Sequence, residues 1–267
     1  KVNLIDFIKD NLNKLNNKQI NIIDVDFHFK KAFDKITDNS NSYIEKSFQI
    51  ALKLLKDQKC IGLINGPISK KNFLKENFYG ITEYLASKTN KKGKVVMLIY
   101  NKKLSVSPIT THLPLKNVHK HLTIKKIVNH IELISYFYKK RFNKIVNVGI
   151  TGLNPHCESN YKSSEEDRII RPAIKLLIKK KIRVNGPFAA DTIFMKEHAK
   201  NYDVIVGMYH DQVLTPIKTL FGFNAINITL GLPFVRISPD HGPNSSMLGK
   251  NLSDPKSLLE AIKFLDK

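Results

Sequence analysis

The chain has 267 residues, of which 42% are hydrophobic and 25% are charged, and these near-average proportions exclude wholesale disorder. No apolar run approaches the roughly 20 residues needed to span a bilayer, so an integral helical membrane protein is excluded. Two cysteines, Cys60 and Cys157, are too few for a disulfide framework, so a reducing cytoplasmic location is expected.

The net charge is +21, which attracts polyanions or phosphorylated metabolites. The basic residues are mostly lysines spread through segments rich in isoleucine and asparagine, with no dense arginine block and no alternation of basic and aromatic residues. Nucleic-acid binding is therefore not favoured, although a steep salt dependence of DNA binding would support it. The opening residues, which start at Lys1, lack the apolar core of a signal peptide.

Hydrophobic periodicity predicts alternating helices and strands along the chain. Helices are expected over 4–15, 41–58, 70–76, 82–89, 124–137, 164–180 and 255–265, the last capped by Asp254 with Pro255 in its first turn, and strands over 20–25, 60–64, 95–100, 104–110, 145–150, 203–208 and 225–230. Residues 186–192 indicate a loop that leads into a helix capped by Asp191. The strands are short, continuous apolar runs, which is typical of a mostly parallel sheet covered on both faces in an α/β fold.

Three of the nine histidines, His112, His156 and His210, lie at or just after the end of a predicted strand. Ligands of open α/β sheets bind at the carboxyl ends of the strands, and three converging imidazoles suit a catalytic divalent metal, Zn²⁺ foremost. The alternative is that each is a polar strand-end residue bonded to backbone. Apart from His241, the other histidines are expected on the surface: His28, His119, His121, His130 and His198.

The stretch 207–242 holds the densest set of polar side chains, including His210, Asp211, Asp240 and His241. Lys218, Asn227 and Arg236 follow one another at intervals of nine residues in it. Two cations and an amide near one strand end suit a phosphate or carboxylate ligand. The ordinary alternative is a solvated lysine and a salt-bridged arginine.

Other motifs carry weaker signals. Residues 66–70 favour a plain turn over an anion-binding one, and Cys157 is interpreted as a bystander thiol because no paired base accompanies it. No Gly-rich dinucleotide fingerprint and no Walker loop follows any strand. The residues thus indicate a metal enzyme with an anionic substrate, and a hydrolase that uses the three histidines to activate water stays open.

Several uncommon motifs in order resemble the 4-hydroxythreonine-4-phosphate dehydrogenase family of vitamin B6 biosynthesis. They are Thr-Thr-His-Leu-Pro-Leu (110–115), Gly-Leu-Asn-Pro-His (152–156), Gly-Pro-Phe-Ala-Ala-Asp-Thr (186–192), Met-Tyr-His-Asp-Gln (208–212), Asn-Ile-Thr-Leu-Gly-Leu-Pro-Phe (227–234) and Asp-His-Gly (240–242). The resemblance covers residues 66–249 and implies an isocitrate/isopropylmalate dehydrogenase-like fold. That fold has two α/β/α lobes with a cleft between them and forms a homodimer with the active site near the interface.

The resemblance also assigns roles and boundaries. The first lobe would comprise residues 1–92 and 243–267, and the second, residues 93–242, would carry the metal site and the dimer interface. His112, His156 and His210 would bind the metal (zinc, with magnesium or cobalt as alternatives). Thr82, Lys218, Asn227 and Arg236 would bind substrate, and His241 and Gly242 would contact NAD. Asp211 and Lys218 would serve catalysis, Asp211 as a carboxylate that supports the neighbouring His210 or handles a proton.

The implied reaction is the metal- and NAD-dependent oxidation of 4-phosphooxy-L-threonine, with loss of CO₂, to 3-amino-2-oxopropyl phosphate. A bound metal would favour the substrate alkoxide that expels hydride and would stabilise the enolate left after CO₂ departs. Such an enzyme has a phosphorylated small molecule as its partner and needs neither nucleic acid nor a membrane.

The sequence departs from the family pattern in three places. Ile81 replaces a histidine in the Gly-His-Thr-Glu segment (here 80–83), so a paralogue acting on another phosphorylated hydroxy acid is an alternative. The family's Gly-rich opening is absent and the chain is short, which indicates a truncated N-terminal part. Residues 243–250 resemble only loosely the loop that holds the adenosine of NAD.

Overall fold

The computed structural model describes residues 1–7, 12–75, 77–157 and 163–266. The strands are β1 (Val2–Ile5), β2 (Ile20–Ile23), β3 (Gly62–Ile64), β4 (Val96–Tyr100), β5 (Ser105–Thr110), β6 (Val148–Thr151), β7 (Val184–Phe188), β8 (Val204–Tyr209), β9 (Ile226–Leu230) and β10 (Val235–Pro239). The helices used here are α2 (Asn41–Lys56), α3 (Lys70–Phe73), α4 (Ile81–Lys88), α5 (Ile124–Phe142), α6 (Arg171–Lys179), α7 (Lys196–Ala199), α8 (His210–Phe221) and α9 (Lys256–Leu265).

One eight-stranded sheet runs through the molecule in the order β3-β10-β9-β4-β5-β8-β6-β7, and β1 pairs with β2 separately. Strands β5, β8, β6 and β7 are all parallel, so their carboxyl ends share one edge. Strands β10, β9, β4 and β5 pair antiparallel in succession, and β4 meets β5 through the single pair Ile99 and Val106. The sheet therefore consists of a parallel block joined by β4 to a mixed block.

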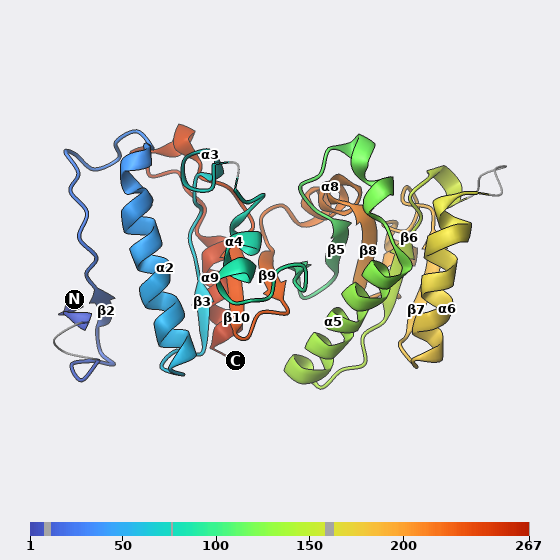
Figure 1. The fold of residues 1–267 in the computed structure, drawn as a ribbon, viewed down its shortest axis with the longest axis horizontal. Coiled ribbons are helices and arrows are strands. Elements are labelled where there is room, and N and C mark those ends of the chain that lie inside the picture. The colour runs from blue at the N-terminus through green and yellow to red at the C-terminus, as the bar shows by residue number, and fades with distance from the viewer. Residues whose placement is uncertain (8–11, 76, 158–162, 267) are drawn as a thin grey trace.

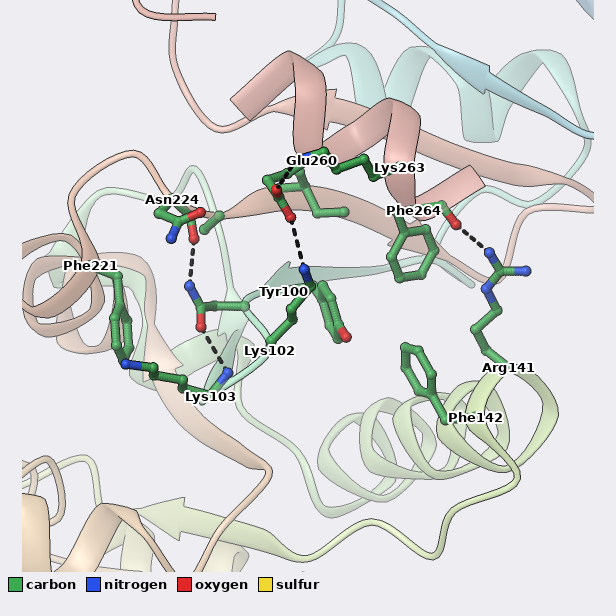
Figure 2. Close-up of a pocket in the computed structure, with 13 residues that line it drawn as sticks. Tyr100, Lys102, Lys103, Arg141, Phe142, Phe221, Asn224, Glu260, Lys263 and Phe264 are labelled. Carbon is green, nitrogen blue, oxygen red and sulfur yellow. Dashed lines mark hydrogen bonds and ion pairs between the residues drawn. The ribbon is translucent and has the colours of Figure 1, made fainter. Parts of the chain in front are cut away.

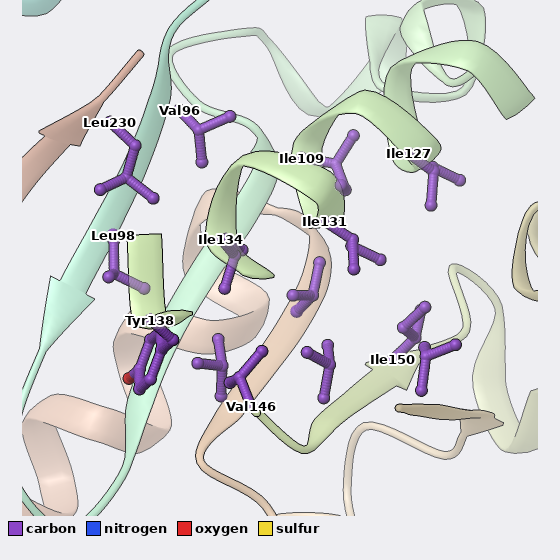
Figure 3. Packing of buried hydrophobic residues seen from close by; sticks show 14 of the residues in the cluster. Val96, Leu98, Ile109, Ile127, Ile131, Ile134, Tyr138, Val146, Ile150 and Leu230 are labelled. Carbon is purple, nitrogen blue, oxygen red and sulfur yellow. The ribbon is translucent and has the colours of Figure 1, made fainter. Parts of the chain in front are cut away.

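Helices cover both faces of the sheet, as the continuous apolar strands predict (Figure 1). On one face, α5 buries Ile127, Ile131 and Ile134 completely against strand residues such as Leu98 and Ile150 (Figure 3). On the other face, α8 packs against the centre of the sheet, while α2 and α4 form a smaller apolar cluster beside β3. About two turns of buried isoleucine on α5 pack closely against the parallel block.

The predicted α/β fold class is confirmed, and the helical periodicity of residues 124–137 and the apolar runs of the central strands correspond to α5, β4, β5, β8 and β9. The division into lobes at residues 92 and 242 stays a prediction. No helix among the described residues is long and apolar enough to cross a membrane.

The prediction of a helix over 4–15 is wrong at its start, because Val2–Ile5 pair in parallel with Ile20–Ile23. Asn3 Nδ2 donates to Asn21 Oδ1 across that pair at 2.8 Å, and Ile5 is buried. Residues 8–11 lie outside the described part of the chain, as does residue 76 of the predicted helix 70–76. Periodicity within one segment cannot reveal a strand whose partner lies far along the chain.

Two further strands, besides β1, escape the sequence prediction. Strand β7 contains Gly186 and Pro187, which read as a loop, but it lies at the sheet edge, where a proline is tolerated. Strand β10 carries Arg236, which breaks its apolar run. The helix expected from Asp191 is also wrong, because 191–195 form turns and α7 begins at Lys196.

The predicted C-terminal helix is confirmed one residue later than expected. Helix α9 begins at Lys256, whose backbone N–H donates to Asp254 Oδ1 at 2.9 Å.

Surface exposure of His130 is a wrong prediction, because this α5 residue is only 5% exposed. Its Nε2 lies 2.6 Å from Ser107 Oγ, and burial lowers the pKa of His130 to about 3, so a neutral imidazole belongs to the core.

Candidate functional site

Two of the three predicted metal ligands lie together at the carboxyl ends of neighbouring strands. His112 comes two residues after β5, His210 follows β8 directly and opens α8, and β5 and β8 are parallel partners. The centroids of the two imidazole rings are 5.9 Å apart. Two imidazoles on one zinc ion have centroids about 5 Å apart for a Zn–N distance of about 2.0 Å, so this imidazole pair (His112 and His210) fits a shared metal.

Polar side chains at the strand ends hold the imidazole pair in place. Thr110 Oγ1 donates to the Met208 carbonyl at 2.7 Å and joins the end of β5 to that of β8. The Gln212 Oε1 accepts from Met208 N at 2.7 Å and from Thr151 Oγ1 at 2.9 Å, and its Nε2 donates to Gly152 O at 2.8 Å. Gln212 therefore joins β8 to β6, a role that its place in the Tyr-His-Asp-Gln motif did not reveal.

His112 is neutral and incompletely bonded. Burial, together with the charges of Lys70 and His210, lowers the pKa of His112 to about 4. The Lys70 Nζ lies 3.1 Å from His112 Nε2, whereas His112 Nδ1 is buried without a hydrogen-bond partner. Because an ammonium can only donate, Nε2 is the acceptor and holds the lone pair of the neutral ring, so a metal ion on His112 would take the place of Lys70 at Nε2.

His210 has a carboxylate partner within its own helix. Its Nδ1 lies 2.6 Å from Asp211 Oδ1. A carboxylate that accepts from one ring nitrogen orients the ring and leaves the other nitrogen for a ligand. The predicted role of Asp211 as a carboxylate that supports His210 thus has a contact behind it, although no described contact shows it handling a proton.

His156 does not join the imidazole pair in this chain. It lies in the short turn Pro155–Cys157, five residues after β6, is exposed, and has a left-handed φ of 58°. Among the described residues, no group of three or more histidine, cysteine, aspartate or glutamate side chains is close enough to hold a metal. The single chain therefore brings together two of the three predicted ligands.

A buried carboxylate organises the loop that carries His156. Glu166, 1% exposed, accepts from the backbone N–H groups of Leu153 and Asn154, each at 2.8 Å. Burial acts to raise the pKa of Glu166, but the hydrogen bonds from Asn154, Leu153 and the Glu166 backbone together outweigh burial, and the pKa is lowered. Cys157 in the same loop is buried and burial raises the pKa of its thiol, which fits the bystander interpretation.

Arg236 forms the second polar centre, the arginine site, with Asn65, Thr82 and Thr229. It is 3% exposed, its Nε donates to Asn65 Oδ1 at 2.8 Å, and its Nη1 donates to Thr229 Oγ1 at 3.0 Å and Thr82 Oγ1 at 3.4 Å. Burial lowers the pKa of Arg236 to about 10, so the guanidinium stays charged. Among the described residues no carboxylate forms an ion pair with Arg236, although the nearby charge of Glu83 opposes the lowering of its pKa, and the buried positive charge suits an anionic ligand.

The predicted substrate residue Thr82 belongs to the arginine site, but Ile81 does not. The Ile81 side chain is 8% exposed and packs in the apolar cluster with Phe48, Leu74 and Tyr84. An isoleucine at this position therefore contributes to the core under α4, and it offers no polar contact to a substrate.

Asn227 extends the arginine site along β9, whereas Lys218 lies on α8. In the register of β9 and β10, Asn227 pairs with Ser238 and Thr229 pairs with Arg236. Asn227 is two residues from Thr229 on β9, so it lies on the same face of the sheet and about 7 Å along the strand. The Asn227 Oδ1 is buried without a partner. Lys218 is instead engaged, since its Nζ donates to Asp240 Oδ2 at 2.5 Å and to the Asp240 carbonyl at 2.7 Å.

Asp240 lies within electrostatic reach of the imidazole pair through His210. Burial raises the pKa of Asp240, and the nearby charges of Lys218, His210 and His241 oppose that rise. His210 therefore lies within electrostatic reach of the loop after β10. His241 and Gly242 in that loop are exposed, and the described contacts of His241 are to Gly242 O at 3.2 Å and to the Phe223 ring at 6.4 Å between centroids.

A cavity of about 330 Å³ lies elsewhere, between α5, α9 and the end of β4 (Figure 2). Glu260 forms two ion pairs there: its Oε2 lies 3.4 Å from Lys102 Nζ, and its Oε1 lies 3.1 Å from Lys263 Nζ. The Arg141 guanidinium donates to the Phe264 carbonyl and lies 4.8 Å from that ring's centroid. None of the site residues predicted from sequence lines this cavity.

These features define an α/β protein in which the start of α4 adjoins both an imidazole pair, through Gly80, and a buried arginine, through Thr82, as expected of an enzyme for small anions. Comparison with known proteins makes the assignment specific. The chain matches the family described as pyridoxal phosphate biosynthetic protein PdxA over residues 1–265, and it belongs to that family.

Two curated relatives and one solved structure illustrate the range of similarity. The 4-hydroxythreonine-4-phosphate dehydrogenase of Sulfurihydrogenibium sp. (strain YO3AOP1) is 40% identical over 249 residues, which cover 92% of this chain and 75% of the relative. A relative from Oceanobacillus iheyensis, provisionally named D-threonate 4-phosphate dehydrogenase, is 32% identical over 86% of this chain and 70% of its own length. The crystal structure of 4-hydroxythreonine-4-phosphate dehydrogenase from Klebsiella pneumoniae superposes with a TM-score of 0.82 at 27% identity, covering 100% of this chain and 82% of that one.

Proposed function

We propose that the chain is a 4-hydroxythreonine-4-phosphate dehydrogenase that uses NAD and a divalent metal, zinc first. It would oxidise the secondary alcohol of 4-phosphooxy-L-threonine and release CO₂, giving 3-amino-2-oxopropyl phosphate for pyridoxal phosphate synthesis. Membership of the family and 40% identity to a curated dehydrogenase of that name support the activity. The observation that carries the assignment to this site is that the start of α4 adjoins both centres, since Gly80 lies beside His112 of the imidazole pair and Thr82 Oγ1 lies 3.4 Å from Arg236 Nη1.

His112 and His210 would hold the metal, and His156 is proposed as the third ligand. When bound, the metal would lower the pKa of the substrate hydroxyl and stabilise the negative charge left on oxygen as CO₂ departs. The neutral state of His112 and the Asp211 contact of His210 leave both rings able to donate a lone pair.

The arginine site would bind the anionic part of the substrate. No described residue accepts a hydrogen bond from Nη2 of Arg236, so that end of the guanidinium is available to a phosphate or carboxylate. Thr82 and Asn227 would add neutral hydrogen bonds, and Lys218 would reach the substrate by exchanging its Asp240 contact. Lys218 is also the ammonium that we assign to proton handling, together with Asp211.

The cofactor would lie along the loop after β10, where His241 and Gly242 are exposed. We further propose a cytoplasmic homodimer with the active site near the interface. The two free cysteines support the reducing location. The exposed position of His156 supports a metal-ligand set that is completed when two copies of the chain form the dimer. Sedimentation of the purified protein, with and without zinc, tests the dimer.

A paralogous dehydrogenase is the second candidate. The side chain of Ile81 points into the apolar cluster, so one polar substrate contact of the family is missing, and the Oceanobacillus relative carries a provisional name with a different phosphorylated hydroxy acid. Such an enzyme would use the same imidazole pair and arginine site on another substrate. A metal-dependent hydrolase would need no NAD.

One assay separates these functions. The protein is incubated with zinc, NAD and 4-phosphooxy-L-threonine while NADH absorbance is followed, and threonate 4-phosphate is tested in parallel. We expect NADH with the first substrate and evolution of CO₂ in equal amount. NADH only with the second substrate would support the paralogue, and no NADH with either would overturn the dehydrogenase proposal.

A further inference from the structure

The turn that carries His156 has a strained backbone. His156 has φ 58° and the next residue, Cys157, has φ 56°, so two consecutive residues with side chains have a positive φ. This region costs free energy for a residue with a Cβ and is normally visited by single residues. Such strain persists where surrounding contacts determine the backbone, and it is frequent at functional sites. The contacts on either side of His156 therefore bear on its role.

On the side before His156, two consecutive glutamates hold Asn154. Glu166 Oε1 accepts from the backbone N–H of Asn154 at 2.8 Å. The side-chain Nδ2 of Asn154 donates to Glu166 Oε2 and to Glu165 Oε2, each at 2.9 Å. Because a carboxylate only accepts, both oxygens of the buried Glu166 match the donors that they face. The backbone and the side chain of Asn154 are thus both fixed, two residues before His156.

On the side after His156, Cys157 is held by two contacts. Its backbone N–H donates to the Asn154 carbonyl at 3.2 Å, which closes the turn around His156. Its side chain is 6% exposed and packs against Gly152, where a Cβ would lie 2.6 Å from Cys157 Sγ and 3.0 Å from Glu166 Oε1. A residue without a side chain at position 152 therefore allows the thiol and the carboxylate to pack together.

We propose that Glu166 is a positioning residue for His156, because its carboxylate holds the turn 152–157 in the one conformation from which the exposed imidazole reaches a metal ion. The imidazole is exposed, so its own packing does not fix it and the neighbouring contacts must. A ligand that is held before binding loses less conformational entropy on binding, so Glu166 raises metal affinity through His156. The hold on the turn stands on these contacts alone, whereas its effect on zinc rests on the proposed function.

The two cysteines report on the turn without any metal. Cys60 is exposed and Cys157 is buried, so an excess of an aromatic disulfide reagent should reveal one fast and one slow thiol in the wild type. A turn that opens more often exposes Cys157 more often, and the slow rate rises in proportion. Calorimetric titration of the same proteins then gives the Kd for Zn²⁺.

Four variants separate the hold on the turn from general stability. Glu166→Leu removes all three hydrogen bonds that the carboxylate accepts from residues 153 and 154, whereas Glu166→Gln keeps an oxygen for the two backbone N–H groups. Gly152→Ala tests the packing independently, because its methyl group displaces Cys157. The control is Glu132→Gln, which removes a carboxylate bonded to Lys180 at 2.6 Å, outside the turn. Thermal unfolding confirms that each variant is folded.

We expect the slow thiol rate to rise about 10- to 100-fold in Glu166→Leu, because hydrogen bonds to a charged group are lost. Zinc binding should weaken about 10- to 100-fold in the same variant. Glu166→Gln should recover part of both losses, Gly152→Ala should raise the thiol rate, and Glu132→Gln should match the wild type.

A slow thiol rate in Glu166→Leu equal to that of the wild type would overturn the proposal. A faster thiol with an unchanged Kd for zinc would also overturn it, since Glu166 would then hold the turn without serving His156, while the proposed function would stand. A wild type that binds no zinc would overturn the proposed metal site and the positioning role together. If Glu166→Leu does not fold, Glu166→Gln and Gly152→Ala, compared with Glu132→Gln, decide between the same outcomes.

Discussion

Two regions of the molecule differ in how their polar groups are satisfied. One consists of the imidazole pair and the arginine site, and the other is the cavity between α5 and α9. In the first region three buried polar atoms lack partners, Glu83 Oε2, His112 Nδ1 and Asn227 Oδ1, and no described carboxylate forms an ion pair with Arg236. In the cavity, Glu260 is paired with two lysines and Arg141 is bonded to backbone, and no buried unpartnered side-chain atom belongs to its described lining.

Buried polar groups without partners therefore indicate a functional site better than the presence of a cavity does. A buried polar group without a partner costs about 1–3 kcal/mol, so several in one place are retained where a ligand completes them. The cavity is lined by groups that already satisfy one another, and it requires no ligand to be stable. Substitutions in the first region should therefore change activity, whereas those in the cavity should not.

The largest effect is expected at His156. His156→Ala should abolish metal binding and reduce turnover more than about 100-fold while the fold survives, because the exposed side chain contributes little packing. Metal content after dialysis against zinc, and the rate of NADH formation, measure this. Full activity in the variant would remove His156 from the metal site.

Arg236→Met should raise KM about 10- to 100-fold, because a charged hydrogen bond to the substrate is worth about 1.5–3 kcal/mol. The methionine fills much of the same buried volume, so the fold should be retained. The control is Lys103→Met in the lining of the cavity. An unchanged KM in Arg236→Met would contradict the role of Arg236 as an anion ligand.

The buried His130 beneath β5 should make stability depend on pH. Its pKa in the folded protein is about 3, below the usual 6.5, so the unfolded chain binds a proton that the folded chain does not. The stabilisation is complete above pH 6.5 and falls by about 1.4 kcal/mol per pH unit as pH drops from 6.5 towards 3. Urea unfolding of the wild type and His130→Gln at several pH values measures it, and equal pH slopes would contradict it.

The smallest effect is expected in the cavity. Glu260→Gln removes a carboxylate that is 27% exposed and pairs with Lys102 and Lys263, so the free energy of unfolding should change by no more than about 1 kcal/mol. Its kcat and KM should stay within about twofold of the wild type. A large loss of activity would show that the cavity, too, takes part in function.

Much of the fold and of the candidate site could be predicted from the sequence, but the position of the proposed third metal ligand could not. Apolar runs and strand-end histidines indicated β5, β8 and the pairing of His112 with His210, because parallel neighbours place their carboxyl ends together. Strand β10 escaped notice because Arg236 breaks its apolar pattern. His156 lies on a turn five residues beyond β6, where strand order no longer fixes the side chain, and no periodicity reports on Gln212 or Glu83.

Anomalous scattering at the zinc absorption edge, from crystals of the protein grown with Zn²⁺, tests the central claim most directly. The account predicts one strong peak in contact with His112 and His210, on the side facing Arg236. A peak among the residues of the α5–α9 cavity, or no peak near either histidine, would contradict it.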